Sequence, residues 1–141
     1  MDKNKKYHLE IDTLTPTEFI ELSKAVGWGL ERNYDMNKVA QAIKETLLSV
    51  VIRDREGRAL GCGRAFSDDL FMTFIPDIFV LPEHQKCGIG KLIIEKMKER
   101  YGHTAFFFGA QPGNEPFFEK LGFQKSMQSY AGRFKKNPYY S

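Results

Sequence analysis

The sequence predicts one mixed α/β domain in which helices pack against a mostly antiparallel sheet. Strand-type and helix-type patterns alternate along the 141 residues, without repeats or low-complexity linkers. Three successive strand-type segments lead, through a turn with two glycines, into an amphipathic helix. The length and an apolar content of 42% suit one core. We therefore expect a single domain over residues 1–141, with flexible tails near 1–6 and 135–141.

The N-terminal third predicts one strand followed by two helices. Residues 7–11 alternate apolar and polar side chains, as a half-buried strand does. Thr15 followed by proline is typical of a helix start, and the Gly-Trp-Gly sequence at 27–29 is typical of a helix end. A second helix is expected to begin at Asn37, a candidate N-cap, and to reach Leu47.

Three strands are expected in the middle of the chain, over residues 48–53, 60–66 and 71–81. Short turns containing glycine or aspartate separate them, so they should form an antiparallel meander. Pro76 stands in the middle of the third strand, where it cannot donate a ladder hydrogen bond. An uninterrupted central strand is therefore excluded, and we expect a bulge or a splayed edge here.

The turn after the third strand combines the features of an anion-binding site. The first turn of a helix has backbone N–H groups without intrahelical partners, and its aligned peptide dipoles place partial positive charge there. Gly88 and Gly90 have no Cβ, so the backbone can approach a bulky pyrophosphate. Gln85, Lys86 and Lys91 flank the same turn with hydrogen-bond donors and positive charge.

Spacing excludes two other kinds of phosphate-binding loop. A Walker loop requires glycine where the chain has Gln85, and Ser or Thr where it has Leu92. A dinucleotide fingerprint requires a third glycine where the chain has Ile93. The turn therefore indicates neither a nucleoside triphosphatase nor a dinucleotide-dependent enzyme.

The C-terminal part predicts a crossover followed by the closing edge of the sheet. The helix after the turn places Ile89, Ile93 and Met97 on one apolar face. Residues 105–109 form an apolar strand, which would complete a right-handed β-α-β crossover. Residues 124–134 leave room for one or two closing strands.

Two segments carry a resemblance to a known family. Residues 85–90 read Gln-x-x-Gly-x-Gly after a Val-x-Pro sequence, and this string resembles the acetyl-CoA signature of the GCN5-related N-acetyltransferase (GNAT) superfamily. Residues 117–123, Phe-Phe-Glu-Lys-Leu-Gly-Phe, are similar to a second element, which closes the coenzyme cleft from a short helix. The preceding Pro-Gly-x-x-x-Phe sequence is similar to that of small members likened to arylalkylamine acetyltransferases. The resemblance spans residues 80–123.

The resemblance implies a GNAT-type sheet of six to seven strands with about four helices, splayed at strands 4 and 5. Unpaired backbone groups of the splayed strand would bind the pantetheine arm of acetyl-CoA as an added strand does. The expected function is transfer of an acetyl group from acetyl-CoA to a primary amine, by direct attack on the thioester. The residues expected to bind acetyl-CoA are Ile78, Phe79, Val80, Gln85, Lys86, Cys87, Gly88, Ile89, Gly90, Lys91, Asn114 and Phe118.

Acetyl transfer requires a neutral amine, a polarised thioester carbonyl and a proton for the departing thiolate. Asp77 is the carboxylate nearest the expected thioester in sequence, and its apolar neighbours make it a candidate base. An aspartate that holds a turn or a backbone amide is the alternative. A backbone N–H near Phe79 or Val80 would polarise the carbonyl. The superfamily commonly has a tyrosine acid where this chain has Phe118, and Tyr130 is a candidate replacement.

The acceptor side in this fold is usually lined by the segment between the first two helices, here residues 27–34. Trp28 and Tyr34 would pack against an aryl or alkyl amine, and Glu31 would attract its positive charge. Trp28 as a core anchor is the alternative. A small amine is the expected acceptor. If the protein is an enzyme, a peptide or protein amine is the alternative acceptor. Because Phe118 replaces the usual tyrosine, a non-catalytic acyl-CoA sensor is the alternative function.

The charge, cysteine content and hydropathy of the sequence indicate which partners and which cellular compartment to expect. A net charge of +3 with dispersed basic residues does not indicate a nucleic-acid binder. Cys62 and Cys87 have neither a metal-ligand spacing nor a disulfide framework, so we expect no metal and reduced thiols. The charged start argues against a signal peptide, and no apolar run approaches the length of a membrane span. We therefore expect a cytoplasmic protein without membrane partners, and aromatic residues within 130–134 suggest a homodimer.

Overall fold

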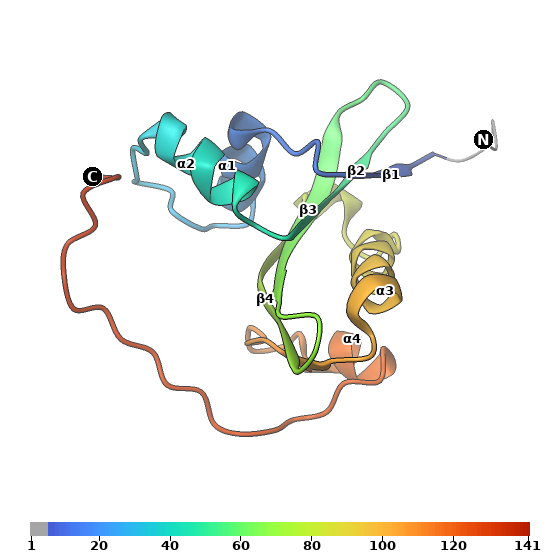
Figure 1. The fold of residues 1–141 in the computed structure, drawn as a ribbon. Helices are drawn as coiled ribbons and strands as arrows, with labels where there is room; N and C mark the ends of the chain where they lie inside the picture. Colours follow the sequence, from blue (N-terminus) through green and yellow to red (C-terminus); the bar gives the residue numbers. More distant parts are fainter. Residues whose placement is uncertain (1–5) are drawn as a thin grey trace.

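The computed structural model describes residues 6–141, so most of the expected N-terminal tail lies outside the described residues. The order of elements is shown in Figure 1. The elements are β1 (His8–Ile11), α1 (Pro16–Ala25), α2 (Met36–Lys44), β2 (Leu48–Arg53), β3 (Ala59–Ser67), β4 (Met72–Val80), the 3₁₀ turn η1 (Pro82–His84), α3 (Ile89–Tyr101), β5 (Ala105–Phe107) and α4 (Glu115–Lys120).

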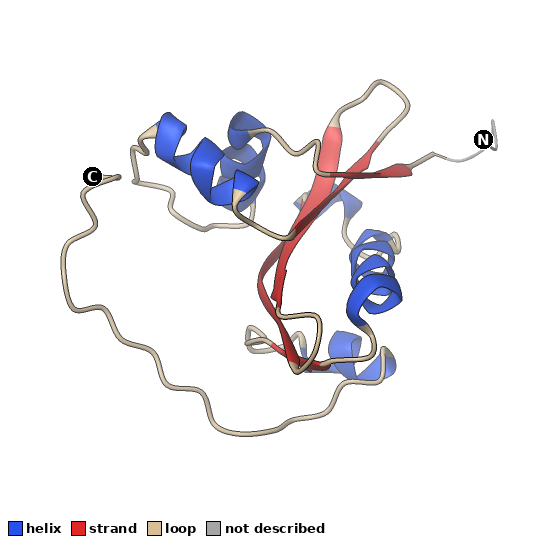
Figure 2. Cartoon of the chain, in the orientation of Figure 1, coloured by secondary structure: helices blue, strands red, loops and turns tan. Residues whose placement is uncertain are grey.

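The elements form three layers, with the sheet between two pairs of helices (Figure 2). Helices α1 and α2 cover one face, and α1 contacts β3 and β4. Helix α3 covers the other face, across β2, β3 and β4. Helix α4 lies beside α3, where Lys98 Nζ donates a hydrogen bond to the backbone oxygen of Leu121.

The sheet has five strands in the order β1-β2-β3-β4-β5. Strands β1 to β4 pair antiparallel, which confirms the expected meander, and β5 joins β4 in parallel. The expectation of six to seven strands is wrong, because residues 124–134 contain no strand. Within the described chain, residues 124–138, which we call the arm, form no backbone–backbone hydrogen bond. Figure 1 shows the arm sweeping around the domain, and β5 keeps a free outer edge.

The bulge expected at Pro76 is confirmed by the register of β3 and β4. Arg64 pairs with Asp77 and Phe66 pairs with Phe74, so three steps along β4 match two steps along β3. The extra residue accommodates the proline, which cannot donate to the ladder.

The expected N-cap of the first helix, Thr15, is confirmed, whereas that of the second helix, Asn37, is wrong. Thr15 caps α1 in a capping box, in which its hydroxyl accepts from the Glu18 N–H and the Glu18 carboxylate accepts from the Thr15 N–H. Helix α2 is capped by Asp35, whose side chain accepts from the Lys38 N–H. Asn37 lies inside the helix, because the acceptor two residues earlier already satisfies the first turn.

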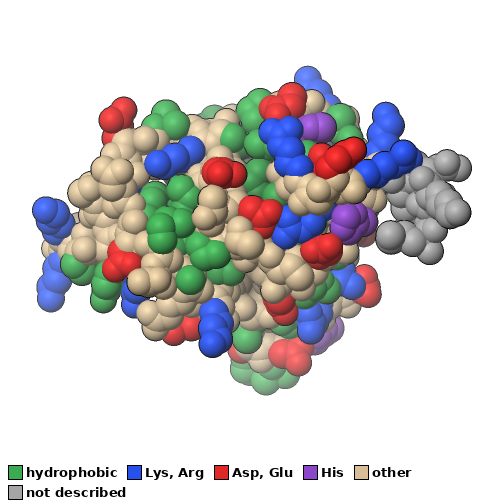
Figure 3. Space-filling model, turned by 90° about the horizontal axis from the view of Figure 1, so that it is seen from above, with side chains coloured by type: hydrophobic (Ala, Val, Ile, Leu, Met, Phe, Trp, Pro, Cys, Tyr) green, Lys and Arg blue, Asp and Glu red, His purple; other side chains and the backbone are tan. Residues whose placement is uncertain are grey.

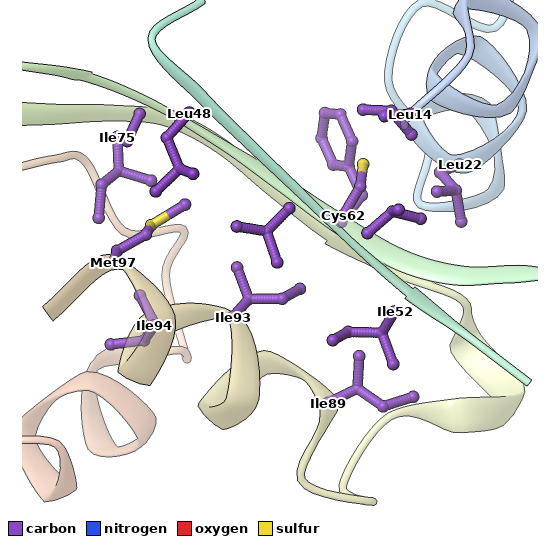
Figure 4. Close-up of a cluster of buried hydrophobic side chains, with 14 of the residues drawn as sticks. Leu14, Leu22, Leu48, Ile52, Cys62, Ile75, Ile89, Ile93, Ile94 and Met97 are labelled. Carbon is purple, nitrogen blue, oxygen red and sulfur yellow. The ribbon is translucent and has the colours of Figure 1, made fainter. Parts of the chain in front are cut away.

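The core lies on both faces of the sheet (Figure 4). Leu22 and Cys62 meet on the α1 side, while Ile93 and Met97 pack on the α3 side. Helix α3 comes close to the sheet because β3 carries glycine on that face. A Cβ added to Gly63 would lie 2.7 Å from the Ile93 Cγ2 atom, which is closer than real contacts allow.

We therefore expect Gly63→Ala to destabilise the protein by about 2 kcal/mol, because the added methyl forces α3 away from the sheet. Gly109→Ala is the matched control, since a Cβ there meets nothing within 4 Å. The control should change the free energy of unfolding by less than about 0.5 kcal/mol. Urea denaturation of both variants measures the difference, and equal stabilities would contradict the close approach.

The surface seen from above carries acidic and basic side chains interspersed, without a region of one sign (Figure 3). Among residues 6–141, no helix combines the length and the apolar character needed to cross a membrane.

Candidate functional site

The turn before α3 has the backbone of an anion site. Lys86 and Gly88 both adopt left-handed conformations, with φ of 64° and 86°. Gly88 is the N-cap of α3 and offers no side-chain cap, and the first backbone bond of the helix runs from the Leu92 N–H to the Gly88 oxygen. In the described chain, the N–H groups of the first three helical residues have no backbone acceptor outside the helix, and their positions give them none within it. Partial positive charge therefore accumulates there.

The two glycines of the turn have different roles. A Cβ added to Gly88 would meet nothing within 4 Å, so space lies open in front of its backbone. A Cβ added to Gly90 would lie 3.0 Å from the Cζ atom of Phe117 in α4. Gly88 is therefore the position where a ligand can approach, whereas Gly90 lets α4 pack against the turn.

One side chain of the turn is bonded to the end of β4, and the others are exposed. Gln85 donates from Nε2 to the backbone oxygen of Val80 at 3.1 Å, which ties the turn to the end of β4. Lys86, Cys87 and Lys91 are exposed. The two lysines can therefore add charge to an anion held by the helix start.

Strand β4 has an open edge next to this turn. Strand β5 pairs only with Met72–Phe74 at the beginning of β4, so Ile78 and Val80 have no partner on that side. The Leu81 N–H donates to Leu60 of β3 at 2.9 Å, and N–H directions alternate along a strand. The N–H groups of Ile78 and Val80 are therefore directed to the open edge, while that of Phe79 is directed to β3.

Of the two expected site residues at α4, Phe118 takes part in packing and Asn114 is exposed. Asn114 is the N-cap residue, and its side chain makes no capping bond. The Phe118 ring lies 4.6 Å from the Phe108 centroid and 5.0 Å from the Phe117 centroid. Phe123 completes the cluster, which fastens α4 to the segment after β5.

Asp77 and Arg64 form an ion pair that we did not expect from the sequence. Arg64 Nε lies 3.1 Å from each Asp77 carboxylate oxygen, and Nη2 lies 2.6 Å from Oδ2. The guanidinium group lies 4.9 Å above the Phe19 ring of α1. Only 11% of the Asp77 side chain is exposed. Both carboxylate oxygens are therefore engaged, on the face of the sheet that α1 covers.

Tyr130 lies in the arm, and 93% of it is exposed. The ring contacts of Phe118 are with other phenylalanines, so the structure does not bring these two residues together. A hollow of about 590 Å³ beside β5 has walls from Phe74, Phe118 and the beginning of the arm. None of its lining residues belongs to the turn before α3.

The expected acceptor residues lie in the connection between α1 and α2. Trp28 is 52% exposed and Glu31 is exposed, so the alternative of Trp28 as a core anchor is wrong. Tyr34 is half-buried, and its ring lies 5.4 Å from that of Tyr140 near the chain end. Tyr140 was not expected here, because no local pattern indicates a contact across so much sequence.

Comparisons with known proteins agree on one family. The family model described as "Acetyltransferase (GNAT) domain" matches residues 46–125. The N-acetyltransferase ycf52 of Pyropia yezoensis is 30% identical, over 83% of this chain and 69% of its own. The chloroplastic GCN5-related N-acetyltransferase 2 of Arabidopsis thaliana is 31% identical, over 58% of this chain and 33% of its own. A solved GNAT-family acetyltransferase of Streptococcus pneumoniae has a TM-score of 0.71 and 20% identity, covering 91% of this chain and 99% of its own, and shows the fold alone.

Proposed function

The chain belongs to the GNAT family of acetyltransferases, and from this premise we propose that it transfers an acetyl group from acetyl-CoA to the primary amine of a small molecule. One observation carries the proposal. The open start of α3, with clear space at Gly88, adjoins the open edge of β4 at Ile78 and Val80. A pyrophosphate and an extended amide-containing arm need these two features side by side.

Acetyl-CoA fits this arrangement group by group. The pyrophosphate would accept hydrogen bonds from the N–H groups of Ile89, Gly90 and Lys91, with Lys86 adding charge. The pantetheine arm would run along β4 and bond to the backbone of Ile78 and Val80. Cys87 lines the same turn, while Asn114 and Phe118 would close the cleft from α4.

The chemistry requires an amine that has lost its proton before it attacks the thioester carbon. The Val80 N–H is directed to the open edge and would polarise the thioester carbonyl. Asp77 is our candidate base, and because Arg64 engages both of its oxygens, the proton of the ammonium group would reach the carboxylate through water. Trp28, Glu31 and Tyr34 would line the acceptor side.

The departing thiolate needs a proton, and Phe118 cannot supply one. We expect Tyr130→Phe to leave kcat within about twofold, because this exposed hydroxyl has no contact with the α4 cluster. We expect Phe118→Tyr to raise kcat, by up to the ~10²-fold that a general acid contributes. The turnover rate at saturating acetyl-CoA gives kcat for each of the two variants. A strongly impaired Tyr130→Phe variant would instead place the acid at Tyr130.

Acetyl-CoA turnover, followed by thiol release, tests the proposal against aryl amines, polyamines and short peptides. A calorimetric titration with CoA on the same sample measures binding separately. Turnover on small amines supports the proposal, and turnover only on peptides supports the peptide alternative. Binding of CoA without turnover supports the acyl-CoA sensor, which Phe118 motivates because its side chain has no proton to give. Absence of both would contradict any acyl-CoA function.

The two cysteines allow a direct test of the turn. Burial raises the pKa of the Cys62 thiol, so it should react with a thiol reagent only after unfolding, whereas Cys87 is exposed. We expect one fast-reacting thiol in the native protein and protection of that thiol by acetyl-CoA. Mass spectrometry after brief alkylation identifies the labelled residue. Labelling of Cys87 at the same rate with saturating acetyl-CoA would contradict binding at the turn.

We also propose that two copies of the chain associate through the arm. Met127, Tyr130 and Phe134 are 79%, 93% and 94% exposed, and the arm and the free edge of β5 both have unpaired backbone. Light scattering should give twice the monomer mass, and Phe134→Ser should lower it. A monomer at high concentration would contradict the association. The cytoplasmic location expected from the sequence stays a prediction, since the name of one relative describes it as chloroplastic.

A further inference from the structure

The connection between α1 and α2, residues 27–35, is anchored at both ends. We call this segment the acceptor loop. At one end the Trp28 N–H donates to the Ser23 oxygen at 2.9 Å, and Gly27 has a φ of 93°, which closes the end of α1. At the other end Asp35 caps α2. Between these anchors, Lys24 Nζ of α1 donates to the Arg32 oxygen at 3.1 Å, and the residues after Arg32 depend on contacts from elsewhere in the chain.

The C-terminal part of the acceptor loop, residues 33–35, is bonded to the last three residues of the sequence. We call Tyr139–Ser141 the strap. Asn33 and Ser141 exchange two backbone hydrogen bonds, of 3.3 Å and 3.1 Å, as a hydrogen-bonded antiparallel pair does. The Asp35 N–H donates to the Tyr139 oxygen at 2.7 Å. Figure 1 shows the chain end beside this loop, so the segment that we expected to be a flexible tail lies on it as a short added strand.

Side chains reinforce the backbone pairing. The centroids of the Tyr140 and Tyr34 rings lie 5.4 Å apart. The Arg32 guanidinium carbon lies 4.4 Å from the centroid of the Tyr140 ring. Arg133 donates to the Tyr140 hydroxyl at 3.1 Å. Tyr140 is therefore the centre of the contact between the strap and the acceptor loop.

The strap is held by its pairing with the acceptor loop, and two side chains of the arm add to this: Arg133 donates to the Tyr140 hydroxyl, and Asn137 Oδ1 accepts from the Tyr139 N–H at 2.9 Å. Within the described residues, the arm forms no backbone–backbone hydrogen bond, so the backbone partners of the strap lie in the acceptor loop. An open groove of about 560 Å³ lies where the strap meets the loop. Its lining residues are Asn33, Tyr34, Asp35, Lys136, Asn137, Pro138, Tyr139, Tyr140 and Ser141.

We propose that the strap fixes the acceptor loop in its binding conformation, so that Tyr140 determines the affinity for the acceptor amine without affecting that for acetyl-CoA. The inference rests on the proposed function. Undocking the strap releases Asn33 and Tyr34 and leaves the Asp35 N–H without its acceptor, although Asp35 still caps α2. The amine must then order this part of the loop itself, which weakens its binding. Tyr140 is a positioning residue, because it acts through Tyr34 and Arg32.

Tyr140→Ala and Tyr140→Phe make a matched pair for the test. Alanine removes the ring contacts with Tyr34 and Arg32, whereas phenylalanine removes only the hydroxyl that Arg133 contacts. Hydrogen–deuterium exchange at the amides of Asn33 and Asp35 reports docking without any substrate. Trp28, the only tryptophan of the sequence, reports amine binding by fluorescence without turnover.

We expect faster exchange at residues 33 and 35 in Tyr140→Ala, with Kd and KM for the best amine of the panel raised about tenfold, or about 1.4 kcal/mol. Tyr140→Phe should restore both, and kcat and the Kd of acetyl-CoA should stay unchanged in each variant. Faster exchange with unchanged amine affinity would reduce the strap to a structural contact and overturn the inference. Unchanged exchange would overturn it as well. If wild-type protein neither binds nor acetylates any amine, the proposed function fails first, and the exchange data still show whether the strap docks.

Discussion

Replacing Gly88 with valine should raise the Kd and KM of acetyl-CoA about 100-fold, which corresponds to about 3 kcal/mol. Gly88 has a φ of 86° and faces open space, so the valine side chain would occupy the volume that we propose for the pyrophosphate. The same change strains the backbone by roughly 1–2 kcal/mol, because residues with a Cβ disfavour the left-handed region. Calorimetric titration with CoA and steady-state kinetics measure the loss.

Gly57→Val separates the two effects. Gly57 lies between β2 and β3 with a φ of 87°, and a Cβ there also meets nothing within 4 Å. Both variants should therefore lose a similar amount of stability, while only Gly88→Val should lose affinity for acetyl-CoA. If folded Gly88→Val protein bound acetyl-CoA as wild type does, the turn would not be the pyrophosphate site.

Replacing Arg64 with methionine should lower the free energy of unfolding by about 3 kcal/mol, because it leaves the Asp77 carboxylate without its partner in a nearly buried position. Removing both charges in Arg64→Met/Asp77→Leu should recover most of that loss, since no uncompensated charge then remains. Urea denaturation at neutral pH measures all three proteins.

Arg58→Met is the matched surface control. Arg58 pairs with Glu83 at 3.4 Å, but 60% of the Arg58 side chain is exposed, so its loss should cost less than about 1 kcal/mol. Equal losses for Arg58→Met and Arg64→Met would mean that the Arg64–Asp77 pair is as solvated as a surface pair. Asp77 would then be free to meet a substrate directly.

Features governed by neighbouring residues could be predicted from the sequence. Thr15 and Glu18 stand at the spacing of a capping box, and the structure has one. Pro76 lacks an N–H group, and the structure has a bulge there. Helix α3 begins one residue after Gly88, because glycine tolerates the left-handed conformation that ends the turn.

Features that depend on pairing between distant residues could not be predicted. Arg64 faces Asp77 only because of the register of β3 and β4, and that register depends on where the bulge falls. The contact between Tyr34 and Tyr140 depends on the course of the arm, for which local patterns hold no information. The missing closing strands have the same cause: residues 124–134 leave room for strands, but a strand exists only where a partner pairs with it.

The bulge at Pro76 also sets the parity of the rest of β4. Side chains and N–H groups both alternate with a period of two, so one extra residue exchanges the two faces and the two edges of everything that follows. With a residue deleted there, Asp77 would turn toward α3, and the N–H groups of Ile78 and Val80 would turn toward β3. The open edge would then present the N–H of Phe79 in place of those of Ile78 and Val80. The edge that we propose for acyl-CoA thus depends on whether the number of residues in β4 is odd or even. A change of one residue in this strand would invert the proposed site while leaving each side chain chemically intact.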